Sequence, residues 1–575
     1  MNDGEAVAYL PPALEHGRAW GIGLQLYALR SRHNWGIGDF GDLRAALELA
    51  RALGADALGI NPLHALPGAD PEAASPYAPS SRYFLNPLYL ELEAVPEFSL
   101  DHPRAASLRA RVASGTFAEG LAKLRREPRV AYGPVARAKG SALDELWAIF
   151  RSRSDARRDA FARFVALGGE RLERFALHEA LAERFAKAHA IGPAWQAWPA
   201  EFRSATSEPV RAWAANHRLR IDRFKYAQWL ADEQLCALQA LAAPMAIGLY
   251  LDLAVGVAAS GADVWSEPAA FVLDETLGAP PDPLGPQGQN WGLPAPDPEV
   301  LLHEHAGFRA LLESNMRHAG ALRLDHVMSL ERLFRIPLGR GADAGRYVAY
   351  PREALLASAA AVSREARCAI VGEDLGTVPE GFRERMRQAQ ILAYRVLLFE
   401  REPDGSFRPP ASYPDLALAT ATTHDLPTLP GWLAGRDLAL REQLEELEPA
   451  QAASARSSRR VERAALATAL HASGALAAPV AAALATESPE LGGPFETAVT
   501  AAAYDFLSQT PARLVLVQLD DALGEIDPVN LPGTFAAYPN WRRKYRRGLE
   551  EFAGDERLRA VCGAVASRIG GGTQR

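Results

Sequence analysis

Cysteine is scarce in this sequence, which excludes two ways of building a protein. Only Cys236, Cys368 and Cys562 occur among the 575 residues. Because they are odd in number and far apart in the chain, they support neither a disulfide framework nor a cysteine metal site. Such sparing use of cysteine is typical of a reducing compartment, and we expect a cytoplasmic location.

An excess of positive charge is also missing. The 62 Lys and Arg residues are outnumbered by 70 Asp and Glu residues, which gives a net charge of −8. The basic residues are scattered, so no basic stripe is available to release counterions from a phosphate backbone. We therefore expect no nucleic acid partner.

Long hydrophobic runs are the third absence. The Ala-rich stretch over residues 464–485 is interrupted by His471 and Pro479, and the acidic start Met1–Glu5 has no apolar core region. A membrane-spanning helix needs about 20 consecutive apolar residues, and a secretory signal needs a shorter apolar core. The sequence therefore predicts no membrane span and no signal peptide.

What is present is enough apolar material for a large folded protein. Hydrophobic residues make up 48% of the chain and charged residues 23%, which excludes a disordered chain. The length exceeds that of a usual single domain. We expect either one large barrel with insertions or a chain of two to four domains.

Short apolar runs that end in polar or turn residues alternate with helical stretches, a pattern typical of parallel βα proteins. Eight such runs predict strands near residues 23–29, 57–60, 247–251, 321–325, 369–373, 393–398, 416–419 and 513–518. Eight strands favour an α/β fold of the (β/α)8 TIM barrel type, forming one unit over residues 1–575. We expect inserted, mainly helical subdomains and no separate C-terminal β domain.

Three long stretches lie between the predicted strands. Residues 100–240 show mixed charge and periodic apolar positions such as Leu143, Leu146, Ile149 and Phe150, which predicts a helical insertion between the second and third strands. Residues 253–318 predict a loop-rich insertion that includes the Pro/Gly segment 278–286, placed over a cleft. The Ala-rich residues 436–510 predict a helical insertion between the seventh and eighth strands.

Three acids close three of the predicted strands: Asp325, Glu373 and Asp425. In a strand, side chains alternate between faces, so Arg323 and Asp325 share one face and can form a hydrogen bond that keeps the aspartate ionised. In a parallel barrel, the carboxyl ends of the strands meet at one rim. Three carboxylates there suit glycosidic-bond chemistry, which needs a nucleophile, an acid/base and a group that binds the distorted sugar.

Eight segments in order along the chain resemble one known family. They are Trp35–Leu43, Ser75-Pro76-Tyr77, Asn86-Pro87, Gly320–Leu330, Gly372–Val378, Thr423–Thr428, Asn530–Thr534 and Tyr538–Arg542. The chain resembles the 4-α-glucanotransferases, or amylomaltases and disproportionating enzymes, of the α-amylase clan. The resemblance implies a transferase of maltodextrin, glycogen or starch metabolism, which moves a segment of an α-1,4-glucan to the 4-hydroxyl of glucose or of another glucan.

The resemblance also implies catalytic roles. Asp325 would be the nucleophile that forms a covalent glucosyl enzyme, and Arg323 would hold it charged. Glu373 would be the general acid and then the base, with a proton affinity that follows the charge on Asp325. Asp425 would stabilise the distorted sugar. Two inversions retain the α-configuration and predict nucleophile and acid/base carboxyls about 5 to 5.5 Å apart.

Further residues resemble the sugar contacts of the family, because flat aromatic faces suit the apolar face of a glucose ring. The implied substrate-binding residues are Tyr77, Asp252, Gln289, Trp291, Arg323, His326 and His424, with Asn530 and Asn540 as weaker candidates. The implied partners are maltose, maltotriose and maltodextrins, with glucose as acceptor. No cofactor and no metal are implied.

A competing motif lies near the N-terminus. Gly36–Gly41 satisfies G-x-G-x-x-G and formally suggests a dinucleotide site. We reject that interpretation because residues 31–35 separate it from the preceding predicted strand, whereas the fingerprint follows its strand directly. The family resemblance instead places it in a loop beside the glucan cleft.

Three alternative functions remain open at this point. A metal-dependent hydrolase could use the two Asp/His pairs 325–326 and 424–425, although such a site needs more clustered ligands. A catalytically silent glucan-binding protein would keep the cleft without the chemistry, but all three acids are present. An α-glucan hydrolase shares the nucleophile and the acid/base and differs in using water as acceptor.

Overall fold

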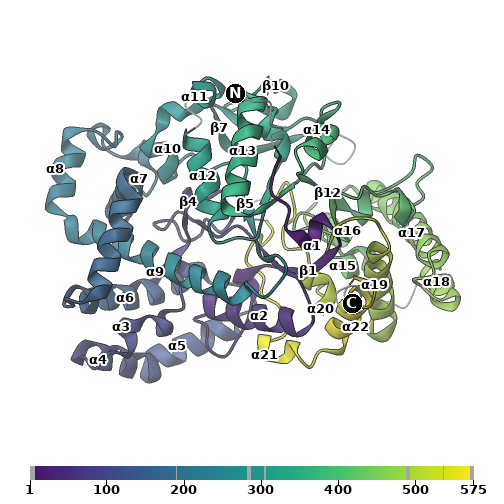
Figure 1. The fold of residues 1–575 in the computed structure, drawn as a ribbon, viewed down its shortest axis with the longest axis horizontal. Helices are drawn as coiled ribbons and strands as arrows, with labels where there is room; N and C mark the ends of the chain where they lie inside the picture. The colour runs from purple at the N-terminus through teal and green to yellow at the C-terminus, as the bar shows by residue number, and fades with distance from the viewer. Residues whose placement is uncertain are drawn as a thin grey trace.

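Eight parallel strands form a closed barrel at the centre of the protein (Figure 1). The structure is a computed structural model, and it describes residues 7–188, 191–281, 287–303, 306–486, 492–534 and 537–569. Around the barrel, the strands are β1 (Ala19–Leu24), β2 (Ala57–Ile60), β5 (Gly248–Leu253), β8 (Ala321–Leu324), β11 (Ala369–Gly372), β12 (Leu392–Val396), β13 (Ala417–Thr420) and β14 (Leu514–Gln518), which pairs with β1. The predicted (β/α)8 fold is confirmed.

The first strand is the one whose position was predicted wrongly. It covers Ala19–Leu24 rather than residues 23–29, and Leu26–Ala28 form a 3-10 helix instead. A Cβ atom on Gly21 would lie 2.7 Å from the carbonyl oxygen of Ala57 in the neighbouring strand. Glycine is needed there for close strand contact, but it weakens the β signal of the sequence.

A large helical region follows β2 and precedes β5, and it lies on the left of the barrel in Figure 1. The short strands β3 (His64–Ala65) and β4 (Ser81–Leu85) come first. The helices are α3 (Pro96–Ser99), α4 (Pro103–Ala113), α5 (Gly115–Arg126), α6 (Tyr132–Arg151), α7 (Ala156–Lys187), α8 (Glu208–Asn216) and α9 (Arg218–Ala242). Their apolar faces pack together through aromatic rings, of which Phe150 and Tyr226 lie 4.8 Å apart.

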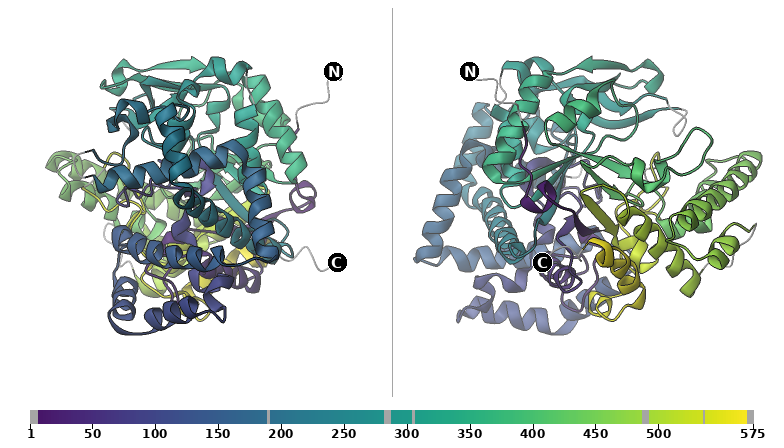
Figure 2. Two further views of the ribbon diagram at one scale, coloured as in Figure 1. Left: turned by 90° about the vertical axis from the view of Figure 1, so that its left-hand side faces the viewer. Right: turned by 45° about the vertical axis from the view of Figure 1, so that its right-hand side comes forward.

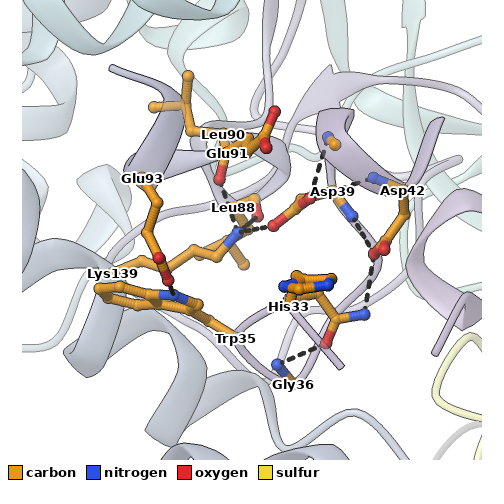
Figure 3. A network of polar contacts seen from close by, with 12 residues as sticks. His33, Trp35, Gly36, Asp39, Asp42, Leu88, Leu90, Glu91, Glu93 and Lys139 are labelled. Atoms are coloured by element: carbon orange, nitrogen blue, oxygen red, sulfur yellow. Dashed lines mark hydrogen bonds and ion pairs between the residues drawn. The ribbon is translucent and has the colours of Figure 1, made fainter. Parts of the chain in front are cut away.

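One buried ion pair ties this helical region to the first barrel helix, α2 (Phe40–Ala52) (Figure 3). Lys139 of α6 donates through Nζ to Asp39 Oδ2 at 3.2 Å and to the carbonyl oxygens of Leu88 and Leu90, each at 2.8 Å. Asp39 and Asp42 cap the start of α2 reciprocally. The Asp39 carboxylate accepts from the N–H groups of Gly41 and Asp42, and the Asp42 carboxylate accepts from the N–H group of Asp39. We call Lys139, Asp39 and Asp42 the helix-cap cluster.

The helix-cap cluster settles the role of the glycine-rich motif. Residues 34–40 are all buried, and the Asn34 amide donates to Asp42 at 2.8 Å. The loop is therefore packed inside the protein, which leaves no room for a dinucleotide phosphate. Lys139 joins Asp39 of this loop to α6 and to the chain around Leu88 (Figure 3), and the place of the loop beside the glucan cleft stays a prediction.

A second sheet stands outside the barrel and was not predicted. It contains β6 (Phe271–Ala279), β7 (Gln289–Pro296), β9 (Arg332–Pro337) and β10 (Arg346–Ala349), all antiparallel in the order β10-β9-β6-β7. Figure 2 shows these strands along the upper edge of the molecule. The helices α10 (Ala262–Ser266), α11 (Pro298–His303) and α12 (Ala306–Met316) flank the β6–β7 hairpin along the chain. Within the Pro/Gly segment, residues 282–286 lie outside the described residues.

The C-terminal half adds mainly helices. Those after β9 are α13 (Arg352–Ala366), α14 (Phe382–Gln388), α15 (Leu429–Ala434), α16 (Arg436–Gln443), α17 (Pro449–Ala472), α18 (Ala478–Leu484), α19 (Gly493–Ser508), α20 (Leu519–Leu523), α21 (Leu549–Phe552) and α22 (Glu556–Ile569). Helices α17 and α18 lie on the right in Figure 1. Among the described residues, no strand follows β14. The helices in these ranges do not include one with the length and apolar character of a membrane span.

Candidate active site

The barrel brings four acids to the carboxyl ends of its strands. Asp252 lies in β5, Asp325 directly follows β8, Glu373 directly follows β11, and Asp425 lies in the loop after β13. The strand register pairs Asp252 with Arg323. Strand ends at this rim are where the active sites of such barrels lie.

The guanidinium group of Arg323 joins three of these acids. Its Nη1 donates to both oxygens of Asp252 at 2.8 and 2.9 Å, and its Nη2 lies 2.9 Å from Asp325 Oδ1. The same Nη2 lies 3.9 Å from Glu373 Oε2. Burial lowers the pKa of Arg323, but Asp252 and Asp325 outweigh it and raise the pKa well above its usual value. Arg323 is therefore a permanent cation between the acids.

Glu373 is held by two backbone donors. The N–H of His326 donates to Oε2 at 2.9 Å and the N–H of Leu375 donates to Oε1 at 2.7 Å. His326 can aim its N–H in this way because it adopts a left-handed backbone, with φ of 47°. Burial and the negative charge of Asp325 raise the pKa of Glu373 to about 7, against the opposing effect of Arg323. Glu373 can therefore give and take a proton near neutral pH.

Asp425 lies on the open side of the same rim. Its side chain is 51% exposed, compared with 16% for Asp325. His424 Nε2 lies 3.2 Å from Asp425 Oδ2, and the amide of Asn530 donates to Oδ1 at 2.7 Å. Burial in the cleft would raise the pKa of Asp425, but His424 and Asn530 lower it to about 2. Asp425 is therefore ionised throughout the physiological range.

Tyr77 connects the two ends of this row of acids. Its hydroxyl donates to Asp252 Oδ2 at 2.6 Å and lies 3.3 Å from His424 Nδ1. The rings of Tyr77 and His424 stack at 4.6 Å. Burial lowers the pKa of His424, but Asp425 raises it above its usual value overall. The cationic form of His424 is thus favoured beside Asp425.

The β6–β7 hairpin supplies the remaining predicted residues. Trp291 meets His326 edge to face at 5.3 Å, and its Nε1 donates to Gln289 Oε1 at 3.0 Å. Burial lowers the pKa of His326 to about 4, so this histidine is neutral at pH 7. The contacts thus link all ten residues that the sequence selected into one cluster at the barrel rim.

A small cavity lies beneath this cluster, inside the mouth of the barrel. Its volume is about 50 Å³, and Tyr77, Asp252, Arg323 and His424 line its upper part. Deeper in the barrel, Tyr250 contributes a buried hydroxyl that has no hydrogen-bond partner among the described residues. The cavity is therefore polar, with room for a water molecule or a sugar hydroxyl.

Two residues at the site lie in segments that carry the family resemblance, although the sequence predicts no firm role for either. Asn530 was a weak candidate, and it bonds Asp425 across 105 positions of the chain. Trp541 had no assigned role, yet its ring centroid lies 5.3 Å from that of Tyr77 and 5.5 Å from that of His424. Sequence adjacency gives no signal for such contacts.

A metal centre is not built from the two Asp/His pairs. Across the described ranges, no group of three or more His, Cys, Asp or Glu side chains is arranged to hold a metal ion. The histidines are instead engaged by other groups: His424 by Asp425 and Tyr77, and His326 by Trp291. Both pairs thus have contacts that account for them without a metal.

Comparison with known proteins finds relatives along most of the chain. The family described as 4-alpha-glucanotransferase matches residues 24–550. A 4-alpha-glucanotransferase of Haemophilus influenzae is 38% identical over 564 residues, which covers 96% of this chain and 79% of that protein. The crystal structure of amylomaltase from Corynebacterium glutamicum superposes with a TM-score of 0.82 at 32% identity, covering 96% of this chain and 76% of that one.

A more distant structure shares the fold alone. The amylomaltase of Streptococcus agalactiae, solved in complex with acarbose, has a TM-score of 0.72 at 18% identity and covers 96% of this chain and 99% of that one. The family match extends over most of the barrel and includes every acid at the rim. The chain therefore belongs to the family of 4-alpha-glucanotransferases.

Proposed function

We propose that Asp325 is the nucleophile and Glu373 the acid/base in a retaining transfer between α-1,4-glucans. The observation that carries this assignment is the shared guanidinium nitrogen of Arg323, 2.9 Å from Asp325 and 3.9 Å from Glu373. The two carboxyl oxygens are separated by no more than the sum of these distances. Both can therefore reach a single anomeric carbon and its leaving oxygen, as double displacement requires.

The reaction has two steps. In the first, protonated Glu373 donates to the glycosidic oxygen while Asp325 attacks the anomeric carbon, so that the donor's reducing-end fragment departs and a glucosyl ester forms. In the second, ionised Glu373 removes the proton from the acceptor 4-hydroxyl, which displaces Asp325. The raised pKa of Glu373, about 7, supplies the proton of the first step.

The residues around the two catalytic acids bind the sugar. Asp425 has its pKa lowered to about 2, so its fixed negative charge can accept hydroxyl protons and stabilise an oxocarbenium-like ring. Tyr77 and Trp291 offer aromatic surface next to His424 and His326 respectively. We expect them to line the donor and acceptor positions.

The substrate class follows from the family and from the site. The Streptococcus agalactiae relative was solved with acarbose, and we infer that this chain takes maltose, maltotriose and longer maltodextrins, with glucose as the smallest acceptor. The insertion over residues 253–318 includes the β6–β7 hairpin, which holds Trp291 beside His326. We infer that this insertion covers the cleft and helps to keep water from the glucosyl enzyme.

Incubation with maltotriose tests the proposal. Transfer breaks one glycosidic bond and makes another, so glucose and a ladder of longer chains should form while total reducing ends stay nearly constant. A steady rise of reducing ends without the ladder would instead show an α-glucan hydrolase. No turnover at all would show a silent binding protein, and loss of turnover with a chelator would show a metal enzyme. The variant Asp325→Asn, which we expect to be inactive, serves as the negative control.

A further inference from the structure

Trp541 has an unusual backbone for its size. Its φ is 60°, in the left-handed region that bulky residues rarely adopt, and only 6% of the residue is exposed. Such a conformation persists only where the surrounding structure fixes it, and it tends to occur at functional sites. The contacts around Trp541 show both what fixes it and what it serves.

The turn between α5 and α6 fixes the backbone. Tyr132 donates its hydroxyl to the Trp541 carbonyl oxygen at 2.9 Å. On either side, the N–H of Val130 donates to the Arg542 carbonyl at 2.6 Å and the N–H of Lys544 donates to the Pro128 carbonyl at 3.0 Å. Residues 128–132 and 541–544 thus form a short antiparallel pairing, which we call the insertion clamp.

The indole ring faces the active site. Its centroid lies 5.3 Å from that of Tyr77 and 5.5 Å from that of His424, at interplanar angles of 47° and 53°. The same two rings hold the acids, because Tyr77 donates to Asp252 and His424 pairs with Asp425. The three rings form one aromatic cluster with an acid on each side.

We propose that Trp541 is a positioning residue for the transfer reaction, which holds the Tyr77 and His424 side chains in place while the insertion clamp holds Trp541. The role rests on the proposed function, in which Asp425 binds the sugar, and no direct contact of Trp541 with the reacting atoms is required. A smaller side chain at this position leaves space into which both rings can move. Since small errors in position are costly for catalysis, turnover suffers more than folding.

Two substitutions separate the ring from the strained backbone. Trp541→Ala and Trp541→Gly both remove the indole, but glycine adopts a positive φ without strain and alanine does not. We expect kcat/KM for maltotriose to fall about 10- to 100-fold in both variants. We expect the glycine variant to melt at the higher temperature. Trp541→Phe should recover most of the activity, since a ring still fills the space.

A matched pair of gentler variants tests the clamp. Tyr132→Phe removes only the hydroxyl that holds Trp541, and we expect kcat to fall about threefold to tenfold with the melting temperature nearly unchanged. Tyr83→Phe removes a similar bond, from the Tyr83 hydroxyl to the Gly307 carbonyl at 3.1 Å, and should leave kcat unchanged.

The outcomes decide between positioning and simple packing. The proposal would be overturned if kcat/KM rose together with the melting temperature from the alanine variant to the glycine variant. It would also be overturned if either variant kept the full wild-type kcat per folded molecule. If kcat fell equally in Tyr132→Phe and Tyr83→Phe, the role of the insertion clamp would be overturned. Failure of the proposed function is distinguishable, because Asp325→Asn would then retain activity whatever the Trp541 variants do.

Discussion

Two buried clusters of charge in this protein have similar chemistry and opposite uses. At the barrel rim, Arg323 lies among Asp252, Asp325 and Glu373. In the helix-cap cluster, Lys139 lies beside Asp39, with Asp42 next to it (Figure 3). Burial raises the pKa of one acid to about 7 in each, Glu373 at the rim and Asp42 in the cap.

The two clusters differ in whether their polar groups are all paired inside the protein. Lys139 Nζ bonds one carboxylate and two main-chain carbonyls, so all three of its donors are used inside the protein. At the rim, the cluster borders a polar cavity, and Asp425 presents half of its side chain to solvent. A raised pKa therefore does not by itself identify a catalytic acid, and it supports the proposed role of Glu373 only together with the cavity that the rim borders.

The largest expected effect sharpens the comparison at the rim. Asp325→Asn should lower kcat/KM for maltotriose at least about 10⁴-fold, equivalent to about 5.5 kcal/mol of barrier, because an amide cannot attack the anomeric carbon. The melting temperature should change little, since the volume is nearly the same. Initial rates and calorimetry measure both. Activity within tenfold of wild type would remove Asp325 from the nucleophile role.

Glu373→Gln should show a smaller loss that depends on the donor. With maltotriose we expect about a 10³-fold decrease, roughly 4 kcal/mol, because the leaving oxygen receives no proton. With an α-glucosyl fluoride donor the first step needs no acid, so a covalent sugar should accumulate on Asp325. Intact-protein mass spectrometry detects it. Equal loss on both donors, with no adduct, would mean that Glu373 only supports the structure.

The helix-cap cluster should respond in stability and not in chemistry. Lys139→Met leaves Asp39 buried without its cation, and we expect the free energy of unfolding to fall by about 3 kcal/mol. Adding Asp39→Asn removes the unpaired charge and should restore much of that loss. Chemical denaturation measures the stability, and kcat per folded molecule should be unchanged. A large drop in kcat would join the two clusters into one functional unit.

A pH-dependent effect compares Glu373 and Asp42 directly. Each pKa is raised to about 7 in the folded protein, so ionisation costs stability as pH rises from the unfolded pKa, about 4, to about 7. Glu373→Gln and Asp42→Asn avoid this cost. Relative to wild type, both should gain about 3 to 4 kcal/mol over that window, because one unit of pKa shift is worth about 1.4 kcal/mol, and no more above it. Thermal denaturation from pH 4 to 8 measures the gain. If the stability difference between variant and wild type did not change with pH, a raised pKa would not be its cause.

The sequence was sufficient for seven of the eight barrel strands because they are short, mainly apolar runs, whereas the glycines of β1 obscured its position. Asp325 and Glu373 directly follow strands β8 and β11, so alternation and strand order placed them together. The antiparallel sheet escaped prediction because its strands pair across the chain from β6 to β10. A hairpin with prolines and glycines also gives a weak β signal.

The finer geometry of the site has no sequence signal of its own. Trp541 reaches His424 through the insertion clamp, and the left-handed backbones of Trp541 and His326 depend on contacts with distant segments. Local propensity would assign neither residue to that region. Only family resemblance pointed to Tyr77 and Trp291.

The insertion clamp also has a consequence for the order in which the enzyme comes into being during synthesis. Tyr132 and Trp541 are 409 positions apart, and β1 must wait for β14 before the barrel can close. Synthesis proceeds from the N-terminus, so the helical insertion emerges long before the segment that it clamps. Contacts of such separation form late. A growing chain that already carries Asp325 and Glu373 thus still lacks the Trp541 ring and the last barrel strand, and it gains a finished glucan site only after residue 541 has been added.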